Sequence, residues 1–115
     1  GKGIFIDHQV LIEPKVVLGN YTQILYGSMI GHHSIVGENC VFQRQCMLMG
    51  TNIVGNNCYF SPSVKALKER AEFGANTWIQ EGIYIRRGTL ENEIVSLNSG
   101  NQSRVQSVDS MNIKE

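Results

Sequence analysis

Two adjacent histidines, and a glycine 18 residues after the first of them, are the residues whose types and spacing could do chemistry. His32 and His33 can take a proton from an amine or a hydroxyl group, because the ordinary pKa of histidine lies close to neutral pH. Gly50 leaves a backbone N–H unobstructed, and such a group can hydrogen-bond the oxyanion of a tetrahedral intermediate. A general base and an oxyanion donor are the minimum set for acyl transfer from a thioester. An adjacent pair of surface histidines can also have no catalytic role.

The spacing of 18 matters because the chain repeats every six residues. A bulky apolar residue occupies every sixth position from Ile6 to Phe60, and a small or β-branched residue follows it four places later, as at Ser34. A period of six fits neither a helix nor one long strand. Within a hexapeptide the alternation of a strand still works, and the Gly or acidic residue beside the apolar position tolerates the backbone of a tight corner. Three short strands therefore make a triangular coil of about 18 residues, in which Gly50 stacks on His32.

The pattern lapses once, at residues 66–72, where Ala66 and Glu72 stand at apolar positions, and it resumes one residue out of step at Phe73. We predict an all-β fold, a parallel β-helix of about five coils with a short loop excursion near residues 66–72. A break between two domains is the less favoured reading, because only about seven residues are involved and no Gly/Ser-rich linker flanks them. Residues 1–97 form the predicted repeat domain, and the polar residues 98–115 form a tail that caps the last coil or is partly disordered.

Composition narrows the choice of partners and compartment. The 115 residues carry ten basic and ten acidic side chains, so nothing suggests binding to nucleic acid. No apolar stretch is long enough to span a bilayer, and no signal peptide precedes the repeat, so we expect no membrane association and a cytoplasmic protein.

The three cysteines fall on the small inward register. Cys40, Cys46 and Cys58 are six and twelve residues apart, which is the spacing of the repeat and not that of a Cys-x-x-Cys zinc site. We expect them to be buried structural thiols.

The repeat resembles that of the bacterial hexapeptide-repeat acyltransferases, and this resemblance implies a left-handed parallel β-helix. The stretch 24–67 is similar to the sialic-acid O-acetyltransferase and bacillosamine N-acetyltransferase group, which has a catalytic histidine in an Ile-(Gly/Glu)-His-(Asp/Glu) corner. Ile30-Gly31-His32, followed by Val36-Gly37, matches that motif. The resemblance implies that His32 is the general base and that Gly50 contacts the thioester carbonyl. His33 replaces the family's orienting carboxylate, and Glu13, one coil earlier, is a candidate substitute.

A second resemblance concerns coenzyme A. The segments Phe73-Gly74-Ala75-Asn76-Thr77-Trp78-Ile79 and Gly100-Asn101-Gln102-Ser103-Arg104-Val105 are similar to segments that lie along the coenzyme A groove of these enzymes. Acetyl-CoA is therefore the expected co-substrate, and basic side chains are expected on its phosphates. The candidates are Lys65, Lys68, Arg70, Arg86, Arg87 and Arg104. Arg86 and Arg87 can also be a solvated face only.

The resemblance bears on metals and assembly as well. The γ-type carbonic anhydrases share the fold and hold zinc through histidines, two of them five residues apart, but Gly37 and Glu38 occupy those positions here. We therefore expect no metal site. Relatives bury flat coil faces around a threefold axis, which implies a homotrimer. The outward apolar residues expected to be covered are Tyr21, Tyr26, Met29 and Met47.

These observations predict an acyltransferase, with transfer of an acetyl group from coenzyme A to an amine or hydroxyl of a sugar or another small acceptor and with His32 as the base. The alternative is a non-catalytic trimeric scaffold or a small-ligand-binding module, because the family's nucleotide-sugar-binding βαβ domain has no counterpart in this sequence.

Overall fold

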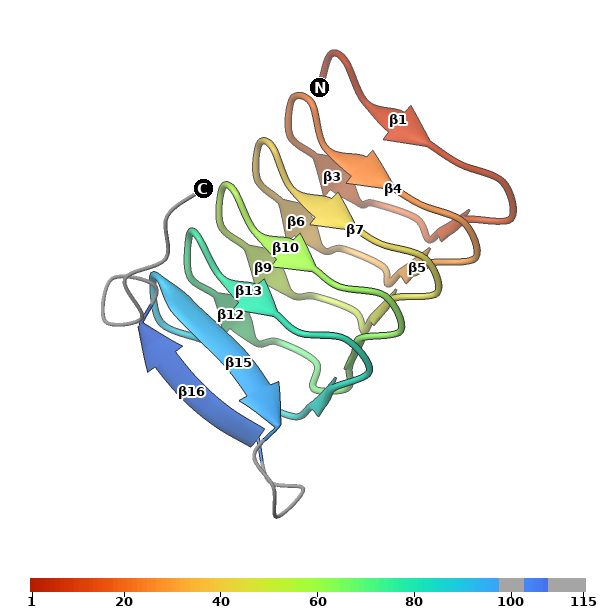
Figure 1. Ribbon diagram of the computed structural model, residues 1–115. Coiled ribbons are helices and arrows are strands. Elements are labelled where there is room, and N and C mark those ends of the chain that lie inside the picture. Colours follow the sequence, from red (N-terminus) through yellow and green to blue (C-terminus); the bar gives the residue numbers. More distant parts are fainter. Residues whose placement is uncertain (98–102, 108–115) are drawn as a thin grey trace.

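Short strands follow one another at the spacing that the repeat predicts. The computed structural model describes residues 1–97 and 103–107, which form sixteen strands and no helix, and hence no helix that could cross a membrane. The first fourteen strands have two residues each: β1 (Phe5–Ile6), β2 (Leu11–Ile12), β3 (Val17–Leu18), β4 (Gln23–Ile24), β5 (Met29–Ile30), β6 (Ile35–Val36), β7 (Val41–Phe42), β8 (Met47–Leu48), β9 (Ile53–Val54), β10 (Tyr59–Phe60), β11 (Lys65–Ala66), β12 (Glu72–Phe73), β13 (Trp78–Ile79) and β14 (Tyr84–Ile85). They stack as successive coils (Figure 1).

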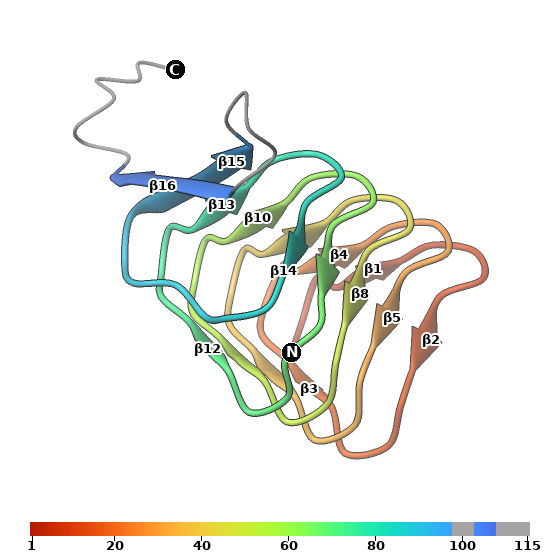
Figure 2. The ribbon, with the colours of Figure 1, turned by 90° about the horizontal axis from the view of Figure 1, so that it is seen from below.

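Every third strand joins the same sheet, so the coil has three walls (Figure 2). The first wall has the order β1-β4-β7-β10-β13-β15-β16, in which β15 spans Glu93–Leu97 and β16 spans Ser103–Ser107. The second wall has the order β14-β11-β8-β5-β2 and the third β12-β9-β6-β3. Strands of successive coils pair in parallel, with Ile12 opposite Ile30 and Ile30 opposite Leu48. This is the parallel β-solenoid of about five coils that the period of six predicts.

The apolar register points inward. Ile24, Ile30 and Leu48 are 0% exposed, and Phe42 stacks on Phe60 with their ring centroids 4.4 Å apart. The other core residues include Val36, Val54, Phe73, Ile79 and Ile85. Burial of each such side chain contributes about 1.5–3 kcal/mol relative to exposure. From β4 to β14 the second residue of each strand is buried and the first is more exposed, which confirms the inward register for these strands.

The small or β-branched residues that follow each inward apolar residue by four places form a ladder of hydrogen bonds inside the coils. Thr22 Oγ1 donates to Gly37 O at 2.8 Å and accepts from Cys40 N at 3.2 Å. The cysteines continue this pattern: the Sγ atoms of Cys40, Cys46 and Cys58 donate to the carbonyls of Gly55, Ser61 and Gly74. Burial raises the pKa of the Cys46 thiol to about 11, and the pKa of Cys58 is raised by its thiol hydrogen bond with Cys40 and then by burial. The prediction of buried structural thiols is confirmed.

The irregularity at residues 66–72 consists of one additional residue in a corner. Ala66 pairs with Leu48, 18 residues earlier, whereas Phe73 pairs with Val54, 19 residues earlier. Ala66 is 1% exposed, so it keeps its inward position. Glu72 is exposed because the neighbouring Phe73 takes the next inward position. The chain thus stays in the coil, and its later register is shifted by one residue.

The buried side chain of Asn52 accommodates the enlarged corner. Its Nδ2 donates to Lys68 O at 3.0 Å, and its Oδ1 accepts from Ala71 N at 2.9 Å. A Ser or Cys at this position is too short to bond both ends of the longer corner. One buried amide therefore replaces the hydroxyl or thiol found elsewhere on this register.

The corners differ from the sequence prediction in one respect. Gly31 is not among the residues with positive φ, whereas His33, two residues later, has a φ of 62°. A Cβ on Gly31 would lie 2.5 Å from the Gly50 nitrogen. Glycine is required at Gly31 because the next coil approaches closely, and not because of its backbone angles; the predicted reason was wrong. The strained left-handed conformation is adopted by His33 itself.

The last two described strands extend the first wall at one end of the solenoid. β15 (Glu93–Leu97) pairs in parallel with β13, and β16 (Ser103–Ser107) pairs antiparallel with β15. The division into a repeat domain of 1–97 and a tail of 98–115 stays a prediction, and residues 98–102 and 108–115 lie outside the described part.

The inward register can be tested within one strand. Ile24→Asp places a carboxylate in the apolar core, where it has no partner, and should lower the free energy of unfolding by several kcal/mol. Gln23→Asp, at the exposed neighbouring position of β4, should change it by less than about 0.5 kcal/mol. Urea denaturation of both variants measures the difference. Equal losses would contradict the inward assignment of Ile24.

Candidate functional site

The corners stack into three edges, and one of them collects most of the predicted site residues. This histidine edge, between the second and third walls, consists of residues 13–15, 31–33, 49–51, 67–70 and 86–88. Backbone hydrogen bonds join its successive corners. His33 N donates to Pro14 O at 3.1 Å, Thr51 N to His32 O at 2.7 Å and Arg70 N to Gly50 O at 3.4 Å.

His32 and Gly50 are in contact, as their spacing predicts. A Cβ on Gly50 would lie 2.7 Å from His32 Nε2 and 2.8 Å from Cε1. The imidazole therefore lies against the Gly50 Cα, and any side chain at Gly50 would displace the ring. The backbone of one coil and the imidazole of the coil before it form a single surface.

The side chains of His32 and His33 are hydrogen-bonded to each other. Their Nδ1 atoms are 3.1 Å apart, and the rings meet nearly at right angles, with centroids 5.3 Å apart and an interplanar angle of 86°. One Nδ1 must carry a proton for this hydrogen bond to form, and the other must accept it. When His32 Nδ1–H donates to His33 Nδ1, the free lone pair of His32 is on Nε2, the nitrogen beside Gly50.

Glu13 lies at this edge, but it does not orient the ring of His32. Its Oε1 accepts from the backbone N–H of His32 at 2.9 Å, so the prediction that Glu13 replaces the family's orienting carboxylate is wrong. One coil later, the residue that stacks on Glu13 is Gly31, which has no side chain. Among the described residues, none accepts a hydrogen bond from the Gly50 N–H. An anionic oxygen is thus bound at one corner, and the equivalent donor of the next corner is free.

Basic side chains extend the histidine edge along the solenoid axis. Lys68, Arg70 and Arg87 line a cavity of about 560 Å³, together with Ala71, Glu72, Gly88, Thr89, Leu90 and Glu93. The two ion pairs of the arginines are long, with 3.9 Å from Arg70 to Glu69 and 4.0 Å from Arg87 to Glu93. The Arg70–Glu69 pair is exposed and therefore weak, and the Arg87–Glu93 pair, in which Glu93 is 17% exposed, is at the limit of ion-pair distance, so both arginines can bind an anion.

The remaining basic candidates are arranged differently. Arg86 is exposed on the same edge but does not line this cavity. Lys65 lies on β11, where its Nζ donates to Gln45 O. Arg104 belongs to β16, and its side chain lies outside the described part of the structure.

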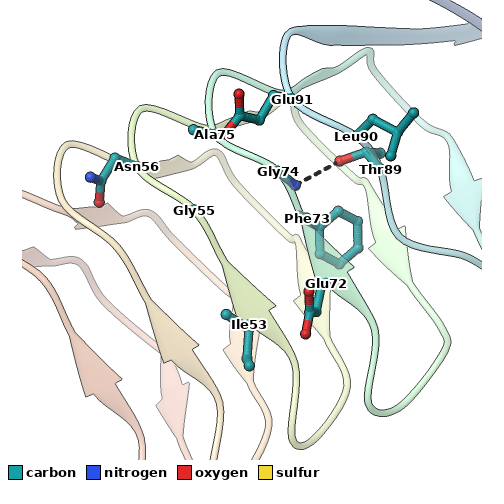
Figure 3. A pocket seen from close by; sticks show the side chains of 10 residues that line it. All are labelled: Ile53, Gly55, Asn56, Glu72, Phe73, Gly74, Ala75, Thr89, Leu90 and Glu91. Carbon is teal, nitrogen blue, oxygen red and sulfur yellow. Dashed lines mark hydrogen bonds between the residues drawn. The ribbon is translucent and has the colours of Figure 1, made fainter.

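The sequence did not predict a second groove, which lies over the third wall and the edge between the third and first walls (Figure 3). It has a volume of about 460 Å³ and is lined by Ile53, Gly55, Asn56, Glu72, Phe73, Gly74, Ala75, Thr89, Leu90 and Glu91. It adjoins the basic cavity, because Glu72, Thr89 and Leu90 line both. The shifted register that turns Glu72 outward was the only sign of it in the sequence. Its carboxylates and the Asn56 amide can hydrogen-bond hydroxyl or ammonium groups.

Residues 1–97 and 103–107 contain no cluster of three His, Cys, Asp or Glu side chains that could hold a metal ion. The chemical groups of the histidine edge are an imidazole pair, a free peptide N–H and a line of basic side chains.

Comparisons with known proteins assign the fold. No protein-family model and no curated protein sequence matches the chain. Among solved structures, WeeI from Acinetobacter baumannii AYE is similar with a TM-score of 0.72 and 14% identity, over 90% of this chain and 54% of that one. The acetyltransferase domain of PglB from Neisseria gonorrhoeae FA1090 follows with a TM-score of 0.63 and 10% identity, over 90% and 55%. A Bacillus cereus protein has a TM-score of 0.57 and 17% identity, over 91% and 74%.

The chain spans about half the length of the first two of these proteins. At such identities the similarity shows a shared fold. The resemblance to hexapeptide-repeat acyltransferases is thus confirmed for the β-solenoid, and an acetyltransferase domain is among the proteins that have it.

Proposed function

We propose that the protein transfers an acyl group, acetyl in the simplest case, from coenzyme A to an amine or hydroxyl of a small acceptor such as a sugar. One observation carries the proposal: the His32 imidazole lies against Gly50, whose N–H has no acceptor among the described residues. His32 is exposed on the histidine edge and Gly50 beside it is buried, and a base next to an oxyanion donor is what acyl transfer from a thioester requires. The shared fold with an acetyltransferase domain supports the same reaction.

In the proposed mechanism the amine or hydroxyl of the acceptor attacks the thioester carbonyl, and His32 Nε2 takes the proton of this amine or hydroxyl. The carbonyl oxygen becomes an oxyanion and accepts a hydrogen bond from Gly50 N–H. Collapse of the tetrahedral intermediate breaks the carbon–sulfur bond. The coenzyme A thiolate leaves and takes the proton held by the imidazolium, so the base returns to its starting state.

His33 has the orienting role in this mechanism. The two Nδ1 atoms are 3.1 Å apart, and the mechanism uses the tautomer in which His33 Nδ1 accepts from His32 Nδ1–H, so that the lone pair of His32 is on Nε2. A neutral imidazole can hold the tautomer in this way, but it stabilises the imidazolium less than a carboxylate does. The exchange of the family's carboxylate for His33 therefore preserves the geometry and gives up part of the electrostatic support.

His32→Ala should lower kcat by about 10²–10⁴-fold, the usual contribution of a positioned acid–base group. The KM for acetyl-CoA and the melting temperature should stay almost unchanged, because His32 is exposed and contributes little to the core. His33→Ala should cost less, and His33→Asp should retain or raise activity. Steady-state kinetics on a panel of amino sugars and alcohols tests this. Unchanged turnover in His32→Ala would reject the mechanism, and a loss confined to His33→Ala would move the base to His33.

The basic cavity is the proposed site of the coenzyme A phosphates. Lys68, Arg70 and Arg87 line it one to two coils beyond Gly50 on the histidine edge, so a donor bound along the axis can bring its thioester to the Gly50 N–H. Arginine and lysine are the side chains that bind phosphate most strongly. Arg86 and Arg104 belong to the proposed set on sequence grounds only.

Arg87→Ala should raise the KM for acetyl-CoA about threefold to tenfold and leave kcat nearly unchanged, because a ground-state phosphate contact is lost. Arg44→Ala is the matched control, since Arg44 is exposed on the edge between the first and second walls. Kinetics at two salt concentrations should show a weaker salt dependence for Arg87→Ala only. The same KM for both variants would place the phosphates elsewhere.

A homotrimer is also proposed, because a column of aliphatic side chains is exposed on the third wall. Val17, Ile35 and Ile53 are 56%, 48% and 46% exposed, one in each of three successive coils. Of the residues expected at the interface, Tyr21 and Tyr26 are exposed and Met29 and Met47 are half-buried. Burying such a column between copies removes apolar surface from water.

Sedimentation equilibrium at micromolar concentration should give three times the mass of one chain. Ile35→Glu should shift this equilibrium toward the monomer, and Gln23→Glu, on the exposed face of the first wall, should not. A wild-type monomer would contradict the trimer.

A non-catalytic ligand-binding scaffold is the second candidate, because the replacement of the orienting carboxylate by His33 weakens the proposed base. Thermal shift with acetyl-CoA separates two cases: stabilisation without turnover indicates a binding module, and no stabilisation indicates a bare scaffold.

A further inference from the structure

We propose that Ser34 and Asn52, both fully buried, are positioning residues that aim the Gly50 N–H at the reacting carbonyl. The inference rests on the proposed acyl transfer and adds two residues that neither a motif nor the resemblance assigns. Neither side chain reaches the edge, so neither would touch a substrate. They act through the peptide bond that joins Met49 to Gly50.

The carbonyl of this peptide is held from inside the coil by two donors. Met49 O accepts from Asn52 Nδ2 at 2.7 Å and from Ser34 Oγ at 3.2 Å, and both residues are 0% exposed. The C=O and N–H of a trans peptide point in opposite directions, and none of the described peptides is cis. Fixing the Met49 carbonyl toward the interior therefore fixes the Gly50 N–H away from it.

The same two bonds make the Gly50 N–H a better donor. Hydrogen bonds in a chain polarise one another, and the interior around Met49 O has a low dielectric constant. Two donors on the carbonyl oxygen draw electron density from the nitrogen. The peptide is thus oriented and polarised before any oxyanion forms, which is the condition under which such a donor lowers a barrier most.

Gly31 and Glu13 show why this donor is free at Gly50. The equivalent N–H of the coil before, that of His32, is occupied by Glu13 Oε1 at 2.9 Å. At Gly31, the next residue of this stack, a Cβ would approach the Gly50 nitrogen to 2.5 Å. Glycine at that position removes the internal acceptor and lets the peptide keep the orientation set by Ser34 and Asn52.

Asn52 also links this peptide to the basic corner. Its Nδ2 donates to Lys68 O at 3.0 Å as well as to Met49 O, and its Oδ1 accepts from Ala71 N. One planar amide therefore fixes both the oxyanion donor and the backbone that carries Lys68 and Arg70. Its placement sets the distance between the proposed thioester and phosphate sites.

A matched pair of serines tests the role of Ser34. Ser28 Oγ donates to Gln43 O at 2.9 Å and accepts from Cys46 N at 3.1 Å, and Ser34 makes the corresponding bonds to Met49 O and Asn52 N. Ser28→Ala and Ser34→Ala should therefore lose similar stability in urea denaturation. Only Ser34→Ala should also lower kcat, by about tenfold, with the KM for acetyl-CoA unchanged.

Asn52→Ser tests the second donor and preserves a residue type that this register accepts elsewhere. It removes the bond to Met49 O and should lower kcat about tenfold, and the double variant with Ser34→Ala should approach the 10²-fold loss of an oxyanion donor. Asn52→Gln, which keeps the amide, should recover part of the activity. If Ser34→Ala and Ser28→Ala lower kcat equally, or if Asn52→Ser leaves it unchanged while His32→Ala abolishes it, the positioning role is overturned.

A readout that needs no turnover separates this inference from the proposed function. In ¹³C-labelled protein the Met49 carbonyl resonance should move upfield in Ser34→Ala and in Asn52→Ser and stay in place in Ser28→Ala, where the Gln43 carbonyl should move. An unchanged Met49 resonance in both variants would overturn the positioning even in an active enzyme. A shifted Met49 resonance in a protein that acetylates no acceptor would sink the proposed function and leave the peptide orientation established.

Discussion

Everything in this protein depends on the hydrogen bonds that run from each coil to the next. Leu11 N donates to Ser28 O at 3.0 Å, and Met29 N donates to Cys46 O at 2.9 Å, one coil further on. A strand of two residues has no stability of its own, so each wall exists only because neighbouring coils pair with it. The same pairing repeats every side-chain position along the axis. The core, the corners and the candidate site all result from this regular stacking of one coil on the next.

The regular stacking of the coils explains why the sequence predicts some features of the candidate site and not others. Contact between His32 and Gly50 follows from the spacing, because residues 18 apart stack wherever the hexapeptide repeat is unbroken, as it is from Ile30 to Leu48. The direction of a corner side chain does not follow, and Glu13 bonds a backbone N–H where an imidazole contact was expected. The Nδ1–Nδ1 bond of His32 and His33 depends on two rotamers in a strained turn, which no periodicity encodes. The shift of one residue at Glu72 is visible in the sequence, but the groove that Glu72 lines is not, because its shape depends on how the side chains around the longer corner pack.

Buried polar side chains in the interior hydrogen-bond successive coils to one another. No buried side-chain nitrogen or oxygen in the described residues lacks a hydrogen-bond partner, as a buried polar group requires. Most of these bonds only hold one coil to another. Those of Ser34 and Asn52 lie directly behind the histidine edge, so the stability of the core and the geometry of the candidate site share the same atoms. A substitution of Ser34 or Asn52 in the core therefore also alters the backbone geometry of the histidine edge.

The variable length of the coil has a consequence for how such a protein can diverge. Paired residues lie 18 apart in the early coils, 19 apart between Val54 and Phe73, and 16 apart between Ile79 and Val95. The walls keep their alignment throughout, because the corners absorb the difference. An insertion or deletion at a corner therefore changes which side chains of neighbouring coils lie next to each other on that edge. The pairing of the hydrophobic interior is unchanged. A change of one residue in corner length should therefore alter the chemistry of the surface and leave the fold intact.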